Sequence, residues 1–316
     1  MPKFTASQIA DWIYKKRVFS IDAMTNLSKQ HRQQLAERYK IGLQLSHYSQ
    51  KSIDGTVKSL YHIANNHNIE TVYIPEDNRA TLCISSQIGC KFGCKFCMTG
   101  KQGFQGNLTA REILNQILSQ TEYDNLTNIV FMGMGEPLDN MSEVMKTCDI
   151  LSADYGLAWS PRRITISTVG ILSQMPRLIE ENKCHIAISL HSPFNEERAG
   201  LMPVQKLNPI ESIIALLKQY NWSGQRRLSF EYIMFKDFND SDRHLKHLIK
   251  LLQGLSCRVN LINYHSIWET QFEPALETQV IKFRDELMKH NIITTIRKSR
   301  GSDIEAACGM LSSKKI

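Results

Sequence analysis

The sequence lacks the long apolar segments that membrane-spanning and exported proteins carry. No run of about 18 apolar residues occurs, so no membrane-spanning helix is expected. The first residues, MPKFTASQIADWIYKKR, contain neither the apolar stretch nor the cleavage signal of a secretory leader. We therefore expect a cytoplasmic protein whose eight cysteines are reduced thiols, metal ligands or catalytic groups rather than a disulfide framework.

Two further absences narrow the organisation of the chain. It has no low-complexity tract and no internal repeat beyond an alternation of strand-like and helix-like segments. The 316 residues are 42% hydrophobic and 22% charged, the balance of a globular protein with a sizeable core. The formal net charge of +7 suits a polyanionic partner such as RNA, and equally an ordinary basic enzyme.

Hydrophobic periodicity divides the chain into four parts. Residues 1–42 have helical spacing, with Ser28 as an N-cap candidate, and form a small basic helical domain that we expect to bind RNA. Residues 43–77 alternate like strands around the turn signal Asp54-Gly55, which predicts a β-meander. Residues 78–296 form an α/β part, and residues 297–316 form a C-terminal segment.

Strand and helix candidates alternate throughout the α/β part. Buried strands joined by helices imply a parallel sheet with right-handed crossovers. Six such units are too few for a closed eight-stranded barrel, so we expect a partial (β/α)6 barrel, with a doubly wound open sheet as the alternative. Either fold places the site at the carboxyl ends of the strands. The expected strands are 80–85, 127–132, 163–168, 184–190, 228–235, 257–263 and 292–296, and the expected helices are 109–121, 140–153, 173–181, 209–221, 241–253 and 276–290.

Three cysteines lie together just after the first strand of this part. Cys90, Cys94 and Cys97 form the pattern C-x3-C-x2-C. Thiolates are soft ligands for iron–sulfur clusters and for zinc. Three of them on one loop can bind three irons of a [4Fe–4S] cluster and leave the fourth iron open to S-adenosylmethionine (SAM). The alternative is a zinc site with Cys83 as fourth ligand, but structural zinc usually takes paired ligands from two elements, and no second pair follows.

This pattern and the sequence around it resemble a known enzyme family. An aromatic residue, Phe96, precedes the last cysteine, as in the radical SAM superfamily. The string TLCISSQIGCKFGCKFCMTGKQGF resembles the RlmN/Cfr family of RNA adenine methyltransferases, and the resemblance continues through IETVYIPEDNR, MGMGEPLDN, RRITISTVG, ISLHSP, LMPV and RGSDIEAACG. MGEPL and RGSDIEAACG look more like the RlmN branch, which methylates C2 of adenine, than the Cfr branch, which methylates C8.

The resemblance implies how the cofactors are held. Cys90, Cys94 and Cys97 would bind one [4Fe–4S] cluster, and two SAM molecules would be used per turnover. From the residues alone, the string GMGEP is only a glycine-rich turn. His265 stands where the family usually has an asparagine, and imidazole can donate or accept a hydrogen bond as an amide does. The residues expected to line the SAM pocket are Gly135, Glu136, Ser167, Ser189, Leu190, His191 and His265.

Three further residues acquire roles only through the resemblance. Cys308 matches the methyl-carrying cysteine of the family, Cys83 the second catalytic thiol, and Glu70 the proton acceptor. Without it, the cysteines would be small buried groups and Glu70 a polar residue on an exposed strand. The implied reaction begins with a methyl group transferred to Cys308 and activated as a radical. This carbon bonds to the adenine, and Cys83 then forms a disulfide with Cys308 to release the crosslinked RNA.

The implied substrates are an adenosine in the peptidyl transferase centre of 23S rRNA and the adenosine following the anticodon in some tRNAs. The target base must leave its stack to reach a buried site. We expect a monomer that receives electrons from a donor such as flavodoxin. A radical SAM enzyme acting on a non-RNA substrate and a zinc-stabilised RNA-binding module remain as alternatives. Candidate phosphate contacts are Arg162, Arg163, Arg226, Arg227, Arg297, Lys298 and Arg300.

Overall fold

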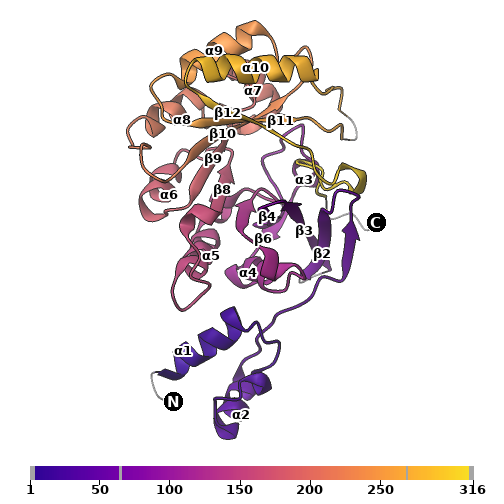
Figure 1. Cartoon of the computed structure of the whole chain (residues 1–316), viewed down its shortest axis with the longest axis vertical. Coiled ribbons are helices and arrows are strands. Elements are labelled where there is room, and N and C mark those ends of the chain that lie inside the picture. Colours follow the sequence, from indigo (N-terminus) through magenta and orange to yellow (C-terminus); the bar gives the residue numbers. More distant parts are fainter. Residues whose placement is uncertain (1–3, 64–65, 268–269, 313–316) are drawn as a thin grey trace.

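One large sheet organises the protein. The structure, a computed structural model, describes residues 4–63, 66–267 and 270–312. Ten strands in these ranges form a single sheet, in which β1 to β4 pair antiparallel and β4 to β12 pair parallel (Figure 1). In sheet order the strands are β1 (Tyr48–Lys51), β2 (Val57–Ile63), β3 (His67–Glu76), β4 (Arg79–Cys83), β7 (Asn128–Phe131), β8 (Ile164–Thr168), β9 (His185–Ser189), β10 (Leu228–Met234), β11 (Arg258–Asn263) and β12 (Ile293–Arg297).

Helical crossovers connect the seven parallel strands of the described chain, and the expected partial (β/α)6 barrel is confirmed. The sheet is open, with β1 and β12 at its two edges. The predicted meander is present, but it continues directly into the parallel sheet through the β3–β4 pairing. The boundaries proposed at 42, 77 and 296 stay predictions. The main crossover helices are α4 (Ala110–Leu118), α5 (Met141–Ser152), α6 (Met175–Glu181), α8 (Ile210–Leu217), α9 (Asp242–Leu252) and α10 (Glu277–Lys289).

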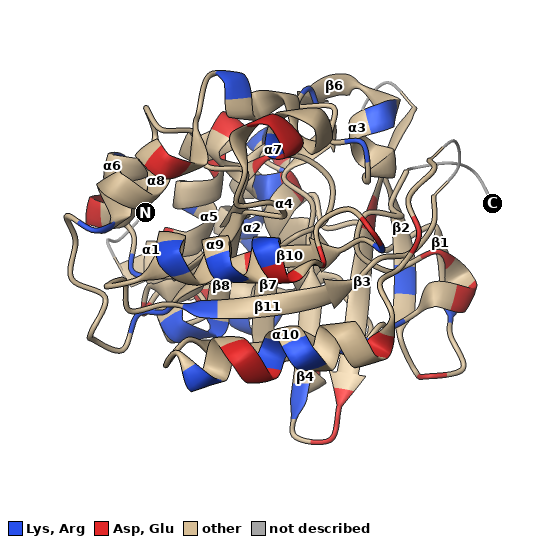
Figure 2. Cartoon of the chain, turned by 90° about the horizontal axis from the view of Figure 1, so that it is seen from above, with Lys and Arg blue, Asp and Glu red and all other residues tan. Residues whose placement is uncertain are grey.

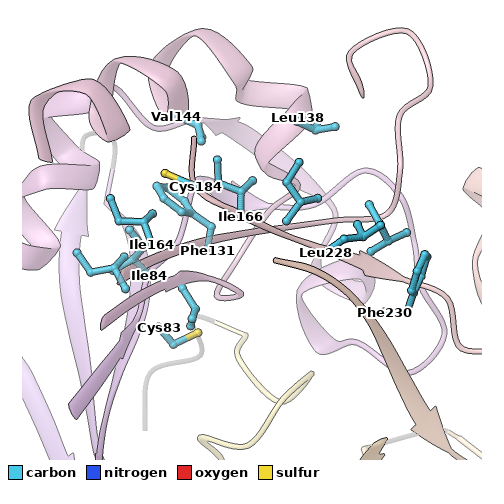
Figure 3. Close-up of a cluster of buried hydrophobic side chains, with 14 of the residues drawn as sticks. Cys83, Ile84, Phe131, Leu138, Val144, Ile164, Ile166, Cys184, Leu228 and Phe230 are labelled. Atoms are coloured by element: carbon cyan, nitrogen blue, oxygen red, sulfur yellow. The ribbon is translucent and has the colours of Figure 1, made fainter. Parts of the chain in front are cut away.

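The core lies between the sheet and these helices. On α4, Ile113 and Ile117 are four residues apart and fully buried, as the helical period requires. They pack in one cluster with strand residues such as Ile164 and Ile166, part of which is drawn in Figure 3. Truncating a buried isoleucine of this kind to alanine usually costs about 2–5 kcal/mol of stability. The crossover helices are thus fixed to the sheet, which gives the loops at the strand ends a rigid base.

Two short helices begin the chain, at the end of the molecule away from α9 and α10 (Figure 1). These are α1 (Phe4–Ala10) and α2 (Lys29–Arg38), and the segment has its own small core of Ile21, Met24 and Leu27. Ser28 caps α2 as predicted, because its hydroxyl accepts a hydrogen bond from the His31 N–H at 3.2 Å. The predicted helical character of this segment is therefore confirmed.

Some elements were not expected from the sequence. A two-stranded ribbon of β5 (Gln87–Gly89) and β6 (Phe104–Asn107) frames the cysteine loop, which contains the short helix α3 (Met98–Gln102). Another helix, α7 (Asn195–Leu201), follows β9, and its polar sequence NEERAGL carries little apolar periodicity. Within the described part of the chain, each helix is too short or too polar to cross a membrane.

Candidate active site

The cysteine loop is closed at its base by close backbone contact. Gly89 has φ +73°, and a Cβ added there would lie 1.7 Å from the Gly103 carbonyl oxygen. Only glycine fits this approach, which brings the two ends of the loop together. The Cys90 N–H also donates to the Gly103 carbonyl at 3.1 Å. The loop therefore projects as a compact unit from the carboxyl end of β4.

The three thiols of the loop lie near one another in low-polarity surroundings. Cys94 is buried, while Cys90 and Cys97 are half-buried. Burial raises the pKa of all three thiols, to about 12 for Cys90, and the charges of the neighbouring cysteines raise the pKa of Cys90 and Cys94 further. A cationic group is thus needed to hold these sulfurs as thiolates. The donor set fits an iron–sulfur cluster, with one thiolate for each of three irons.

Apolar side chains surround this loop. Phe96 packs edge-on against the His191 ring, with centroids 4.7 Å apart, and also contacts Phe235 at 6.1 Å. Such cover keeps water from the sulfurs, which suits a reducible cluster. Across the described ranges, no three His, Cys, Asp or Glu side chains converge as they would around a single metal ion. The buried members of this apolar group are Cys94, Phe96, Val169, Leu201, Met202, Val204, Ile233, Phe235 and Tyr264.

Gly135 and Glu136 lie at the carboxyl end of β7. Gly135 has φ +98°, and a Cβ there would lie 2.5 Å from the Cβ of Gln87, so the turn requires glycine. The Glu136 carboxylate accepts hydrogen bonds from the Thr168 hydroxyl at 2.5 Å and from the N–H of Val169 at 2.9 Å. Burial nevertheless raises the pKa of Glu136 to about 7. This side chain ties the ends of β7 and β8 together, and its role towards SAM stays a prediction.

An arginine that the sequence analysis did not single out shapes the ends of β8 and β9. Arg198 is fully buried and donates to the carbonyls of Ser189 at 2.9 Å, Leu190 at 3.2 Å and Val169 at 3.0 Å. These bonds fix the expected pocket residues Ser189 and Leu190. Ser167, at the end of β8, is half-buried beside them. The expected SAM-lining residues of these two strands thus lie at the same edge of the sheet.

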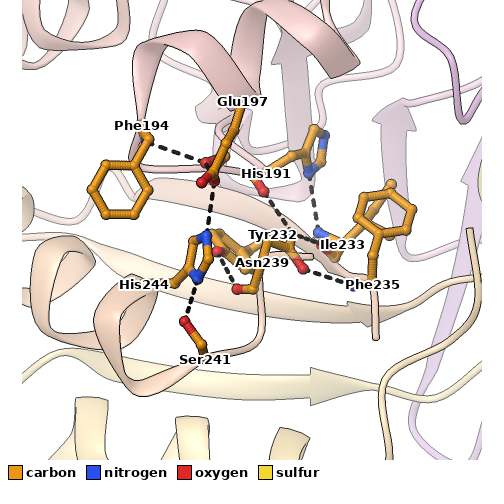
Figure 4. Close-up of polar contacts among 10 residues, drawn as sticks. His191, Phe194, Glu197, Tyr232, Ile233, Phe235, Asn239, Ser241 and His244 are labelled. Atoms are coloured by element: carbon orange, nitrogen blue, oxygen red, sulfur yellow. Dashed lines mark hydrogen bonds and ion pairs between the residues drawn. The ribbon is translucent and has the colours of Figure 1, made fainter. Parts of the chain in front are cut away.

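His191 links three parts of this edge (Figure 4). Its Nδ1 accepts a hydrogen bond from the Ile233 N–H at 3.0 Å, and its carbonyl accepts from the Asn239 amide at 2.6 Å. Burial, with a smaller effect of Arg198, lowers the pKa of His191 to about 3, so its ring is neutral. The nearby hydrogen bond between Glu197 and His244, 2.8 Å long, anchors α9 outside the site. His191 therefore acts here as a rigid neutral contact for Phe96.

The C-terminal segment, residues 301–312, is held against the meander. The Asp303 carboxylate accepts from the Ser52 hydroxyl at 2.6 Å and the Ile53 N–H at 3.2 Å. The Gly301 N–H donates to the Asp54 carboxylate at 2.9 Å. The Asp54-Gly55 turn, predicted from the sequence, thus receives a segment from the far end of the chain.

The same segment is also held against the cysteine loop. Gly309 has φ +85°, and a Cβ there would lie 2.6 Å from the Phe96 carbonyl oxygen. Its own carbonyl accepts from the Met98 N–H at 2.7 Å, and the Leu311 carbonyl accepts from the Thr99 hydroxyl at 2.6 Å. Gly309 thus allows Cys308 to approach the cysteine loop closely.

Cys83 and Cys308 are brought together by this docking. Burial raises the pKa of Cys83 to about 12, and the Cys308 charge raises it further, because the two thiols are neighbours. Cys308 remains exposed to solvent, although the surrounding protein raises the pKa of its thiol. A hydrogen bond from Arg297 opposes this shift, and Cys97 lies close enough to add to it. Both thiols are free, and Cys308 is close to Cys83 and to Cys97 of the cysteine loop.

Glu70 faces the C-terminal segment from the middle of β3. It is 2% exposed, so the expectation of an exposed strand residue is wrong. Its Oε2 accepts from the Ser312 N–H at 3.0 Å, and its Oε1 lies 3.9 Å from Lys58 Nζ, an ion pair that is itself buried. Lys58 also donates to the Glu305 carbonyl at 3.5 Å. Glu70 therefore contacts the segment that carries Cys308, and its role as proton acceptor stays a prediction.

His265 lies at the end of β11 and its ring is hydrogen-bonded to the hydroxyl of Ser299. Burial lowers the pKa of His265. His265 thus links the loop after β11, where the SAM pocket is expected, to the loop after β12, which leads to Cys308. Whether its ring contacts SAM as the family asparagine does stays a prediction.

Two charged residues, on β10 and β12 to either side of β11, were not assigned to the thiol pair from the sequence. Arg297, at the end of β12, lies 3.8 Å from Glu231 of β10 and 3.3 Å from the Met132 sulfur beyond β7. It lies beside the thiol pair, and its role as a phosphate contact stays a prediction. A charged residue at an inward position of an apolar strand was the available signal for Glu231. Its partners come from other strands, which local sequence does not reveal.

The candidate phosphate contacts Arg162, Arg163 and Arg226 lie at the amino ends of the strands, at the edge of the sheet opposite the cysteine loop. Arg226 donates to the carbonyls of Cys184 at 2.8 Å and Ile179 at 2.6 Å, and so caps the end of α6. Arg162 and Arg163 precede β8. Figure 2 shows Lys and Arg mixed with Asp and Glu along α10. The net charge of the chain is thus not a guide to the position of its active site.

Comparison with known proteins agrees with this geometry. The Radical SAM superfamily matches residues 84–249, and the ribosomal RNA large subunit methyltransferase N-terminal domain matches residues 1–41. The chain is 58% identical to the probable dual-specificity RNA methyltransferase RlmN of Bacteroides thetaiotaomicron, over 100% of this chain and 91% of that one. This chain belongs to the RlmN family.

Two further comparisons, at lower sequence identity, extend this result. The dual-specificity RNA methyltransferase RlmN of Syntrophotalea carbinolica is 41% identical over 99% of this chain and 84% of its own. The crystal structure of a radical SAM methyltransferase from Sphaerobacter thermophilus matches with a TM-score of 0.94 at 37% identity, covering 99% of this chain and 94% of that one. The protein is therefore a radical SAM methyltransferase, and its cofactors are a [4Fe–4S] cluster and SAM.

Proposed function

We propose that this enzyme methylates C2 of an adenosine in the peptidyl transferase centre of 23S rRNA, and the adenosine following the anticodon of some tRNAs. The observation that carries the proposal is the placement of Cys83 beside Cys308, close to the cluster loop. Adenine C2 is an electron-poor ring carbon, so ordinary methyl transfer from a sulfonium does not reach it. A thiol that carries the methyl group as far as the base, and a second thiol that then releases it, provide another route to this carbon. The names of the relatives, dual-specificity RNA methyltransferases, support the RNA substrates.

Cys308 receives the methyl group in the first step. Its sulfur bonds to the methyl carbon as the sulfonium–methyl bond of SAM breaks, and the thiol proton is lost. The exposed position of Cys308 suits an incoming substrate, and the Arg297 guanidinium beside it favours the thiolate. When bound, the cluster and SAM supply the radical that activates this methyl group for addition to the base.

Cys83 and Glu70 complete the reaction. The Cys83 sulfur attacks Cys308, so that a disulfide forms as the bond between Cys308 sulfur and the transferred carbon breaks, and that carbon takes up a proton to become the methyl group. Glu70 accepts the proton that leaves C2. A cellular reductant then restores both thiols. The hydrogen bond from the Ser312 N–H supports this role, since it holds Glu70 against the segment that carries Cys308.

The RNA must present its base outside a stack. Radical transfer at a site covered by Phe96 and its neighbours requires an extruded or single-stranded adenosine. The match of residues 1–41 to an rRNA methyltransferase N-terminal domain supports RNA binding by this segment. Action on these RNAs would place the enzyme in the cytoplasm, where we expect a monomer served by a donor such as flavodoxin.

Mass spectrometry of rRNA and tRNA from cells with and without the gene tests the proposal. We expect a C2-methylated adenosine in both RNAs that disappears on deletion and returns with the wild-type gene, but not with a Cys308→Ala gene. A methyl group at C8 would instead indicate Cfr-like chemistry. RNA that is identical in the two strains would contradict the proposed function.

A further inference from the structure

A buried carboxylate oxygen beside the thiol pair has no hydrogen-bond partner. Glu231 is 3% exposed, and its Oε1 accepts a hydrogen bond from the Asn260 amide at 2.7 Å. Its Oε2 is buried without any hydrogen bond from the described residues. The nearest cation, Arg297 Nη1, is 3.8 Å away, beyond hydrogen-bond distance. Leaving such an oxygen unpaired is costly, so the position suits a donor supplied by a ligand.

The neighbours of Glu231 fix its orientation towards the site. On the sheet it pairs with Ser189 of β9 and Asn260 of β11, so these three side chains share one face. Asn260 is itself held by the Thr295 hydroxyl at 2.6 Å, which locks the first carboxylate oxygen in place. The second oxygen is therefore directed by the fold rather than free to rotate.

The thiol pair of Cys83 and Cys308 lies near Glu231, because Arg297 is close to all three residues. Arg297 extends from β12 to the Met132 sulfur beyond β7 and so spans the open side of the partial barrel next to Glu231. Arg297 is also the hydrogen-bond donor to Cys308. Glu231, Arg297 and Cys308 are thus mutual neighbours, and a base seated against the methyl carrier would meet the carboxylate.

We propose that Glu231 Oε2 accepts a hydrogen bond from the 6-amino group of the target adenine. This inference rests on the proposed RNA function. Adenine carries its only exocyclic N–H donor at C6, on the same edge as C2, where a carboxylate is a matching acceptor. A base with a carbonyl oxygen at C6 would place two acceptors against each other and be rejected. Glu231 would then select adenine for methylation.

Glu231→Gln is the sharpest test because it keeps the shape of the side chain while it replaces one oxygen by nitrogen and removes the charge that faces Arg297. The glutamine oxygen can keep the hydrogen bond from Asn260, which places the amide nitrogen at the Oε2 position. An acceptor becomes a donor there, with almost no change in volume. The reconstituted holoenzyme is assayed on an rRNA fragment carrying either adenosine or inosine at the target position, since inosine keeps the C2 hydrogen but has an oxygen at C6.

We expect the wild-type enzyme to prefer the adenosine RNA and the variant to lose or reverse that preference. The ratio of kcat/KM for adenosine over inosine should fall by roughly 10- to 100-fold in Glu231→Gln, the usual effect of one hydrogen bond to a charged group. Comparing ratios removes the intrinsic difference in reactivity of the two bases. Glu197→Gln is the matched control, because that carboxylate binds His244 outside the site, and its ratio should equal that of the wild type.

Methylation of Cys308 by SAM, measured on the intact protein without RNA, separates the remaining explanations. It should persist in Glu231→Gln, at a rate altered by the loss of the Glu231 charge that faces Arg297 and Cys308. An unchanged adenosine-to-inosine ratio would overturn the inference, and so would loss of Cys308 methylation with the ratio preserved, which would assign the carboxylate to SAM. If the wild-type enzyme methylates its own Cys308 but neither RNA, the proposed function itself fails, and this result is distinct from the other two.

Discussion

The two edges of the parallel sheet use the same residue types for different purposes. At the carboxyl edge, Gly89 and Gly309 have positive φ and bring backbones into contact around cysteines, as Gly309 does against Phe96. At the amino edge, Gly254 also has positive φ, but a side chain there would meet open space. Arginine shows the same contrast, since Arg297 reaches the thiol pair while Arg226 caps carbonyls at the end of α6. The edge at which a residue lies, more than its type, indicates whether it takes part in the chemistry.

The largest effect is expected at the methyl carrier. Cys308→Ala should abolish RNA methylation, because the sulfur that accepts the methyl group is gone, while reductive SAM cleavage persists. Cys257→Ala is the matched control, since that half-buried cysteine lies just before β11 at the amino edge. RNA methylation and SAM cleavage products are measured in parallel by mass spectrometry. Methyl transfer by Cys308→Ala at the wild-type rate would remove the distinction between the edges.

A pair of glycines gives the next largest difference. Gly309→Ala places a Cβ 2.6 Å from the Phe96 carbonyl in addition to the strain of positive φ, so the Cys308 segment should be displaced. We expect methylation to fall by at least roughly 10-fold, consistent with the sensitivity of radical transfer to misplacement. Gly254→Ala has only the conformational cost of about 1–2 kcal/mol and should leave kcat intact. Thermal melts and methylation assays of both variants test this, and equal activities would contradict it.

Two buried histidines provide a pH comparison. Burial lowers the pKa of His191 at the carboxyl edge to about 3 and that of His185 at the amino edge to about 4, against about 6.5 for a free imidazole. Between these values the unfolded chain binds more protons than the folded one, so stability is present above pH 6.5 and is lost as the pH falls. His191→Asn keeps an acceptor for the Ile233 N–H and tolerates the residue's φ of +56°.

At pH 5, His191→Asn and His185→Asn should each remove about 2 kcal/mol of the stability loss that acid causes in the wild type. Only His191→Asn should also slow methylation, because only that ring packs against Phe96. The melting temperature is followed from pH 7 to pH 5 in the wild type, His191→Asn and His185→Asn. If the melting temperature of a variant falls between pH 7 and pH 5 as much as that of the wild type, the fold does not hold that histidine neutral.

The smallest effect is expected for arginines at the amino edge. Arg162→Ala and Arg163→Ala should each change kcat/KM for RNA by less than about threefold, since a remote cation contributes only weak, screened attraction to phosphates. Titration of the salt dependence of RNA binding checks this. A large loss of affinity would mean that RNA extends around the sheet to the opposite edge.

Local sequence was sufficient for most of the fold but not for the assembly of the site. Alternating and helical periodicity located the parallel strands and crossover helices, because burial against a sheet imposes those periods. The joining of the meander to the sheet depends on pairing between β3 and β4 across the Asp77-Asn78 turn, which periodicity does not report. The cysteine loop was visible because its ligands are close in sequence.

The remaining site residues were recovered by resemblance or only from the structure. The Cys83–Cys308 pair unites opposite ends of the chain, so no local pattern announces it. Lys58, Arg198, Glu231 and Arg297 were missed because each is paired with groups on other elements. Charged residues inside apolar strands are a usable signal, since a buried charge needs a partner.

The central claim is that Cys83 and Cys308 act as a pair on an RNA base. It is tested most directly by incubating Cys83→Ala holoenzyme with SAM, a reductant and the rRNA fragment, then locating any covalent adduct by mass spectrometry. We expect RNA bound to Cys308 through the transferred carbon, with none formed by the Cys83→Ala/Cys308→Ala double variant. Normal turnover of the Cys83→Ala enzyme, with free methylated RNA and no adduct, would contradict it.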